Sequence, residues 1–219
     1  MNTDNFKIAG SDIKEKYGQK RGEIEQRLLE FGESWQKDDI HVFGELAFCL
    51  LTPQSKAKSC WRVIEKLKEN GLLYSGTAEE MKKWMASVRF NDNKSKYVAE
   101  ARRLFSDGDQ IKIKERVDSF QGVFSKRDWL VKNVKGFGMK EASHFLRNVG
   151  FGNDIAILDR HILKNLVRYG VIEEAPKSLT KKKYKEIEQR MREFSDKIGI
   201  PMAHLDLLWW SEEAGEIFK

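Results

Sequence analysis

The chain has 219 residues, of which 34% are charged, and its formal net charge at pH 7 is +6. This length allows one large domain or two small ones, and the basic balance favours a polyanionic partner. The two cysteines, Cys49 and Cys60, read as reduced core thiols and argue against a disulfide scaffold, a four-cysteine metal site or an iron–sulfur cluster. Because no apolar run approaches about 18 residues and no signal-peptide pattern is present, we expect an intracellular protein without a membrane span.

Helical periodicity dominates the chain, and no convincing alternating β pattern interrupts it, so an all-α fold is predicted. Residues 1–20 are polar and are expected to form an extended or helical arm, and residues 111–124 are less regular. Helices are predicted over 24–35, 42–51, 56–68, 77–88, 93–105, 128–134, 139–149, 160–169, 180–198 and 202–214.

Two of these helices flank the sequence Lys135-Gly136-Phe137-Gly138. Asp128 is predicted to cap the first helix, and Gly136 and Gly138 break the helical pattern because glycine adopts backbone conformations that other residues resist. Backbone N–H groups at the start of the second helix, with the helix dipole behind them, suit a phosphate. The same pattern also fits an ordinary corner between two helices.

Lys140 and Asp159 follow the hairpin and carry the candidate chemistry. Lys140 lies in the first turn of a helix, where the positive end of the dipole favours the neutral amine, which is the form that attacks an electrophilic carbon. Asp159 comes before a new helical pattern and is predicted to cap that helix. Its carboxylate could also orient the amine. The alternative is a solvated lysine that contacts DNA phosphate and an aspartate that only caps.

The hairpin, the lysine and the aspartate, in this order and spacing, resemble the helix-hairpin-helix base-excision DNA glycosylases. Within that group the resemblance is nearest to the compact 8-oxoguanine DNA glycosylases of archaea and some thermophilic bacteria. Similar segments include residues 50–57, 88–97 and 205–219, so the resemblance covers the chain from about residue 24 to its end. One departure is clear, because Ile157-Leu158 stand where the family has Gly-Pro.

The resemblance implies one glycosylase domain over residues 1–219, built of two helical lobes with a cleft between them. Its hairpin motif spans residues 128–150, and the N- and C-terminal segments are expected to share one lobe. The lysine after the hairpin is typical of the bifunctional branch, in which Lys140 would form a Schiff base with the sugar and Asp159 would assist. No metal and no organic cofactor is required.

The base pocket implied by the resemblance needs stacking surfaces for a flipped base. Phe90 and Trp210 are predicted to form this sandwich, although a core position is about equally expected for Phe90, while Trp209 is assigned to the core. The C-terminal carboxylate of Lys219 is predicted to accept a hydrogen bond from the N7–H that oxidised guanine has and normal guanine lacks.

Four further residues or groups are predicted to touch DNA: the N–H groups of Gly136 and Gly138, the Gln54-Ser55 turn near the vacated base, and His161 at a phosphate. For His161, a surface position without any role is almost as plausible. The expected partner is double-stranded DNA that contains an oxidised base, bound by a monomer in the cytoplasm, at the nucleoid of a prokaryote. Two alternatives stay open: a bifunctional glycosylase for oxidised pyrimidines, and a non-catalytic hairpin module that only binds DNA.

Overall fold

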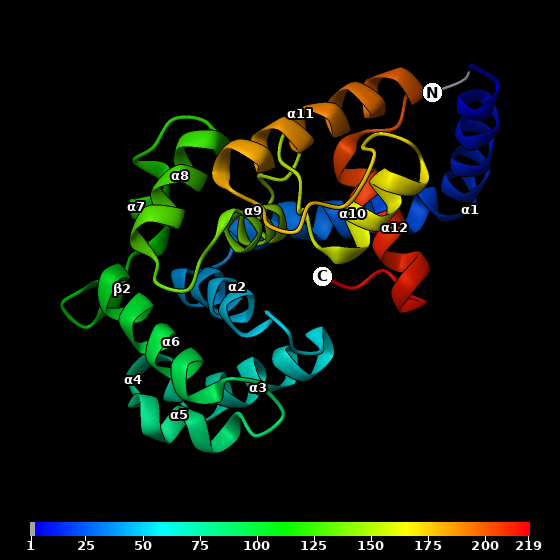
Figure 1. Cartoon of the computed structure of the whole chain (residues 1–219). Coiled ribbons are helices and arrows are strands. Elements are labelled where there is room, and N and C mark those ends of the chain that lie inside the picture. Colours follow the sequence, from blue (N-terminus) through cyan, green and yellow to red (C-terminus); the bar gives the residue numbers. More distant parts are fainter. Residues whose placement is uncertain (1–2) are drawn as a thin grey trace.

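The computed structural model describes the backbone of residues 3–219 and the side chains of residues 12–213 and 215–219. Helices make up most of it, so the predicted all-α class is confirmed (Figure 1). A short antiparallel pair, β1 (Ser106–Asp107) and β2 (Gln110–Ile111), is the sheet within this range. The helices are α1 (Thr3–Gln36), α2 (Asp39–Leu51), α3 (Ala57–Glu69), α4 (Leu72–Ser75), α5 (Ala78–Trp84), α6 (Asn91–Phe105), α7 (Ile113–Asp118), α8 (Val123–Asn133), α9 (Met139–Asn148), α10 (Arg160–Arg168), α11 (Lys181–Ile198) and α12 (Met202–Ala214).

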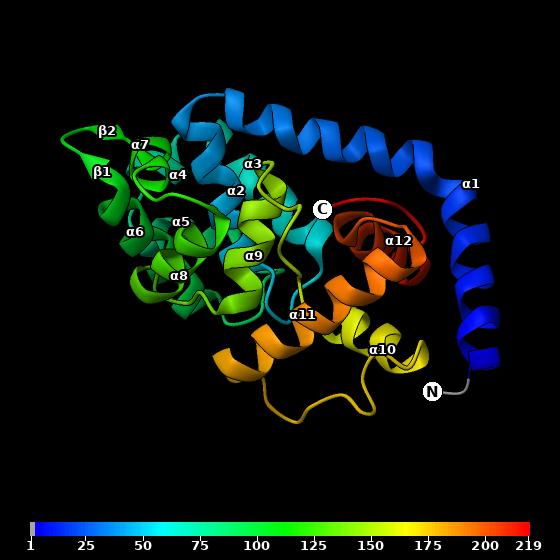
Figure 2. The same ribbon diagram turned by 90° about the horizontal axis from the view of Figure 1, so that it is seen from above.

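Two helices begin much earlier in the chain than the sequence predicts. The polar arm and the helix predicted from residue 24 are one helix, α1, which bends and follows two adjacent edges of the molecule (Figure 2). The predicted N-cap Asp128 is wrong, because the N-cap of α8 is Gly122, six residues earlier, with a φ of 73°. Asp128 lies inside α8, where its carboxylate pairs with Lys181 at 3.1 Å and Lys185 at 3.4 Å.

The buried apolar side chains form two cores. The first is built by residues between Val42 and Ile155, which belong to α2–α9 and the segment that follows. The second joins α1 to α10–α12, so residues from the N-terminal and C-terminal parts of the chain share it. Helix α9 contributes to both, with Met139 in the second core and Phe145 in the first. The helix that carries Lys140 is therefore fixed from two sides.

The two cysteines and Trp209 lie where the sequence predicts. Cys49 and Cys60 are both buried free thiols, as predicted. Trp209 is fully buried in the second core and stacks on Tyr169 with ring centroids 5.7 Å apart, which confirms its assignment to the core. Within residues 3–219, no helix has both the length and the apolar character needed to cross a membrane.

Candidate active site

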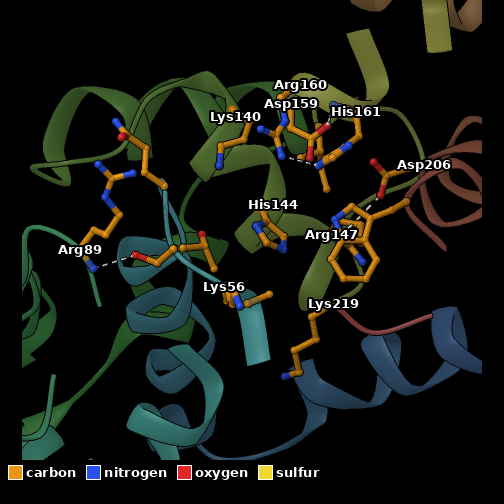
Figure 3. Close-up of a pocket in the computed structure, with 16 residues that line it drawn as sticks. Lys56, Arg89, Lys140, His144, Arg147, Asp159, Arg160, His161, Asp206 and Lys219 are labelled. Carbon is orange, nitrogen blue, oxygen red and sulfur yellow. Dashed lines mark hydrogen bonds and ion pairs between the residues drawn. The ribbon is translucent and has the colours of Figure 1, made fainter. Parts of the chain in front are cut away.

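A cavity of about 670 Å³ lies where elements of the two cores meet. Helix α9, the start of α10, α12 and the loop between α2 and α3 all contribute to its wall (Figure 3). It brings together seven of the residues predicted from the sequence: Gln54, Ser55, Lys140, Asp159, His161, Trp210 and Lys219. Phe90, Gly136 and Gly138 do not line it.

The hairpin before α9 is set by its glycines. Gly136 has a φ of 92°, and a Cβ atom added there would lie 2.6 Å from the ring of Tyr97, so both conformation and packing require glycine. The N–H of Gly138 donates to the Glu141 carboxylate at 3.1 Å. The other oxygen of Glu141 pairs with Nζ of Lys140 at 3.1 Å. In this arrangement Glu141 connects the hairpin to the candidate nucleophile.

Asp159 caps α10, as the sequence predicts. Its Oδ1 accepts hydrogen bonds from the N–H groups of His161 at 2.8 Å and Ile162 at 2.9 Å. Both bonds use the same oxygen, so Oδ2 takes no part in the cap. Lys140 and Asp159 project into the same part of the cavity (Figure 3), but the ion pair of Lys140 is with Glu141. The aspartate can therefore cap the helix and still present an oxygen to the cavity.

The segment that leads to Asp159 is held by a buried hydroxyl. The hydroxyl of Tyr184 on α11 donates to the carbonyl of Ala156 at 2.6 Å and accepts from the N–H of Leu158 at 3.1 Å. Ile157 and Leu158, which stand where the sequence resemblance led us to expect Gly-Pro, are 6% and 2% exposed. Side-chain burial and the hydrogen bonds of Tyr184 thus fix this segment without a proline.

An ion pair completes the support beneath the cavity. Arg127 on α8 donates to the two oxygens of Glu188 at 2.5 and 2.7 Å, and the same arginine donates to Ser143 on α9 at 3.1 Å. Glu188 also accepts from the N–H of Ala156 at 2.8 Å. The arginine is fully buried and the glutamate nearly so, which makes this a paired and hydrogen-bonded buried charge.

The floor of the cavity is polar, which sequence reasoning missed. His144 and Arg147 follow Lys140 by four and seven residues on α9, so all three share one helix face. Three of the buried side-chain atoms that lack a hydrogen-bond partner in the described part of the chain lie here: His144 Nε2 and Arg147 Nε and Nη1. Asp206 of α12 lies 3.8 Å from Arg147. A ligand with acceptor groups would satisfy the unpaired donors of Arg147.

Burial decides the charge states on this floor. Burial raises the pKa of Asp206 to about 6, although Arg147 opposes the shift and Asp159 adds to it. Burial also holds the pKa of His144 well below its usual value, and the nearby cations Arg147 and Lys140 act in the same direction. His144 is therefore neutral at pH 7, while Asp206 titrates near physiological pH. The spacing from Lys140 places His144 and Arg147 on the same helix face, but it does not reveal that they are buried.

The C-terminal residue is anchored by its side chain. Lys219 forms an ion pair with Glu45 of α2, and its Nζ lies 3.4 Å from the ring centroid of Trp61. Burial lowers the pKa of Lys219, whereas the Glu45 carboxylate favours its charged form. The side chain extends away from Arg147 and Asp206 (Figure 3). Lys219 lines the cavity while its ammonium is bound outside the polar floor.

The aromatic residues differ in their placement. Trp210 is half-buried in the cavity wall, where a flat base could stack on it. Phe90 is 55% exposed, so it is not a core residue, and it stands outside the cavity wall with Arg89 placed 5.5 Å from its ring centroid. Its left-handed backbone, with a φ of 60°, turns the side chain outward at the start of α6.

Comparison with known proteins agrees with this geometry. A family model described as 8-oxoguanine DNA glycosylase matches residues 24–200. The chain belongs to this family. The 8-oxoguanine DNA glycosylase/AP lyase of Fusobacterium nucleatum is 49% identical over 212 residues, which cover 95% of this chain and 97% of that protein. The resemblance inferred from the hairpin, Lys140 and Asp159 is confirmed.

Solved structures of the family match across almost the whole chain. The 8-oxoguanine glycosylase/lyase of Methanocaldococcus jannaschii, in complex with 15mer DNA containing 8-oxoguanine, matches with a TM-score of 0.87 at 33% identity, covering 97% of this chain and 100% of that one. The 8-oxoguanine DNA glycosylase of Thermotoga maritima matches with a TM-score of 0.83 at 30% identity, covering 98% and 100%. The family's fold therefore extends over both cores and the cavity.

Proposed function

We propose that this protein is a bifunctional DNA glycosylase, which excises 8-oxoguanine from duplex DNA and then cleaves the strand at the abasic site. The observation that carries the proposal is the convergence of Lys140 and Asp159 on one cavity with a polar floor. The Fusobacterium nucleatum relative is named an 8-oxoguanine DNA glycosylase/AP lyase, and the Methanocaldococcus jannaschii structure contains 8-oxoguanine DNA. Both support the assignment.

The reaction begins with a flipped nucleotide, because the glycosidic bond of a stacked base is out of reach. The neutral amine of Lys140 attacks C1′, the bond from C1′ to the base breaks, and the base leaves with a proton. Asp159 stabilises the positive charge that develops on the sugar and takes a proton from the amine. Glu141, which contacts Nζ of Lys140, is a second acceptor for that proton.

The second half of the reaction uses the same covalent bond. The C1′–O4′ bond opens and leaves an imine between C1′ and Nζ of Lys140, with the ring oxygen protonated. The imine acidifies the C2′ protons, and loss of one of them expels the 3′ phosphate by β-elimination. Water then releases the lysine from the opened sugar. These steps need the lysine, a proton acceptor and water.

The base pocket combines stacking with polar recognition. Trp210 supplies one face, and Phe90 supplies the other when its loop approaches the cavity on DNA binding. The carboxylate of Lys219 accepts from the N7–H of 8-oxoguanine. The anchoring of the lysine side chain by Glu45 supports this role, because it fixes the chain end at the cavity. Undamaged guanine would place an acceptor against that carboxylate.

DNA is held outside the pocket through its backbone. The N–H groups of Gly136 and Gly138 and the ring of His161 bind phosphates, while Gln54 and Ser55 contact the duplex near the vacated base. His161 lies 3.4 Å from Glu213, and Gly138 donates to Glu141, so phosphate binding rearranges both contacts. We infer a monomer that acts in the cytoplasm, at the nucleoid.

Borohydride trapping on a duplex with one 8-oxoguanine tests the proposal. Borohydride reduces the imine to a stable amine, so wild-type protein should become covalently attached to DNA and Lys140→Gln should not. Lys66→Gln, at an exposed lysine on α3, is the control and should form as much adduct as wild type. No wild-type adduct with 8-oxoguanine but an adduct with an oxidised pyrimidine would favour a pyrimidine-lesion glycosylase. DNA binding without any adduct would favour a binding module.

A further inference from the structure

Lys94 joins two loops at the rim of the cavity. It lies in the first turn of α6 and is only 4% exposed. Its Nζ donates to the carbonyls of Leu51 at 2.7 Å and Pro53 at 2.6 Å, and to the Ser55 hydroxyl at 3.1 Å. The Ser55 hydroxyl also accepts from the N–H of Arg89 at 3.0 Å. One ammonium thus connects the turn after α2 with the loop before α6.

Burial of the Lys94 ammonium is energetically unfavourable, because its charge loses contact with water. Lys94 lies at the N-terminal end of α6, where the helix dipole repels a cation, and burial lowers its pKa. The carbonyls of Leu51 and Pro53, at the negative end of α2, offset this cost. An apolar side chain would avoid the desolvation of the charge, but it could not bind three oxygens at once. The arrangement therefore fixes the path of the 52–55 turn.

The two joined loops hold strained residues. Within the described part of the chain, Gln54 and Phe90 are the non-glycine residues with a positive φ, at 56° and 60°. Lys94 binds both chain neighbours of Gln54, which are Pro53 and Ser55. The residue before Phe90, Arg89, donates its N–H to the Ser55 hydroxyl. A left-handed backbone at such residues persists only where the surroundings impose it. Both side chains are exposed beside the cavity.

We propose that Lys94 is a positioning residue that holds Gln54 and Phe90 ready for base extrusion, coupling the turn that fills the gap in the duplex to the loop that closes the base pocket. This inference rests on the proposed glycosylase function. The amide of Gln54 has both donors and acceptors, so it can bond to the edge of an unpaired base of any identity. The ring of Phe90 offers a stacking surface for the flipped base.

The test separates extrusion from chemistry. Cleavage of an abasic site in single-stranded DNA needs Lys140 and Asp159 but no base extrusion, whereas excision of 8-oxoguanine from a duplex needs both. Lys94→Met keeps the length of the side chain and removes the ammonium. We expect it to slow single-turnover excision by about tenfold or more, while abasic-site cleavage stays within about twofold of wild type. A 2-aminopurine beside the lesion should show reduced unstacking.

Two further variants make the outcome decisive. Lys96→Met, at an exposed position of the same helix, is the matched control and should leave both rates unchanged. If Lys94→Met does not fold, Lys94→Gln, whose shorter neutral amide cannot reach all three oxygens, should slow excision in the same selective way. Equal loss of both activities, or normal excision, overturns the role of Lys94. Failure of wild type to excise 8-oxoguanine would instead overturn the proposed function.

Discussion

Removal of one hydroxyl from the second core should weaken both the fold and the reaction. Tyr184→Phe deletes the group that donates to the carbonyl of Ala156 and accepts from the N–H of Leu158. Tyr184 is 1% exposed, so water cannot replace it without rearrangement. The two backbone groups lie within three residues of Asp159, so their loss should let the candidate catalytic carboxylate move relative to Lys140.

The size of the effect follows from these two bonds. Each buried polar group left without a partner costs about 1–3 kcal/mol, so the loss of two partners should lower the free energy of unfolding by about 2–6 kcal/mol. A displacement of the carboxylate by about 1 Å can slow a positioned reaction by about 100-fold. We expect abasic-site cleavage to slow by between about tenfold and 100-fold under conditions where the variant remains folded.

Urea unfolding and single-turnover cleavage measure the two effects separately. Tyr74→Phe is the matched control, because the described part of the chain gives its hydroxyl no hydrogen bond and it lies on α4, outside the site. It should change stability by less than about 0.5 kcal/mol and leave the cleavage rate unchanged. If Tyr184→Phe has equally small effects, the hydroxyl does not hold the segment before Asp159, and the argument fails.

Three other changes have defined outcomes. Because the pKa of Asp206 is raised to about 6, ionisation of this carboxyl group lowers the free energy of unfolding. The loss is absent below pH 3.8, the ordinary pKa, grows as the pH rises to about 6, and is complete above that value. The effect of Asp206→Asn on the free energy of unfolding should therefore be more favourable at pH 7 than at pH 4, by up to about 3 kcal/mol, and an equal effect of the substitution at both pH values would contradict the shift. Gly136→Ala should lower the free energy of unfolding by about 2 kcal/mol or more, because the added Cβ atom would overlap the ring of Tyr97. Gly22→Ala places its Cβ in open space on α1 and should raise the free energy of unfolding slightly, and calorimetry measures both changes. Residues added after Lys219 should impair 8-oxoguanine excision and leave DNA affinity in a gel-shift assay unchanged, and normal excision would remove the chain end from the recognition scheme.

Local signals explain what the sequence predicted correctly. The glycines of the hairpin, the apolar face of α9 and the cap at Asp159 each depend on residues within one or two turns, and all three were found. The start of α8 was misplaced because Asp128 has the character of a cap, although the break lies at Gly122. A carboxylate that pairs with another helix looks the same in sequence as one that caps its own.

The polar floor and the rim could not be predicted in the same way. His144 and Arg147 read as polar residues on a helix, and only the folded chain shows that both are buried and that Asp206 of α12 lies beside Arg147. Similarly, Lys94 reads as one basic residue among many. Its three bonds join segments about forty positions apart in the chain. Long-range contacts of this kind leave no local pattern.

The buried pair of Arg127 and Glu188 gives the reason why Lys140 and Asp159 can meet. Arg127 bonds to Ser143, one turn after Lys140 on α9, and Glu188 bonds to Ala156, three residues before Asp159. One network therefore ties the helix of the lysine to the segment of the aspartate. Apolar residues of similar volume are often as stabilising as a buried ion pair, so stability alone does not require these charges. An apolar replacement would lack the directional bonds to α9 and to the segment before Asp159, and these bonds help to set the two at a fixed distance.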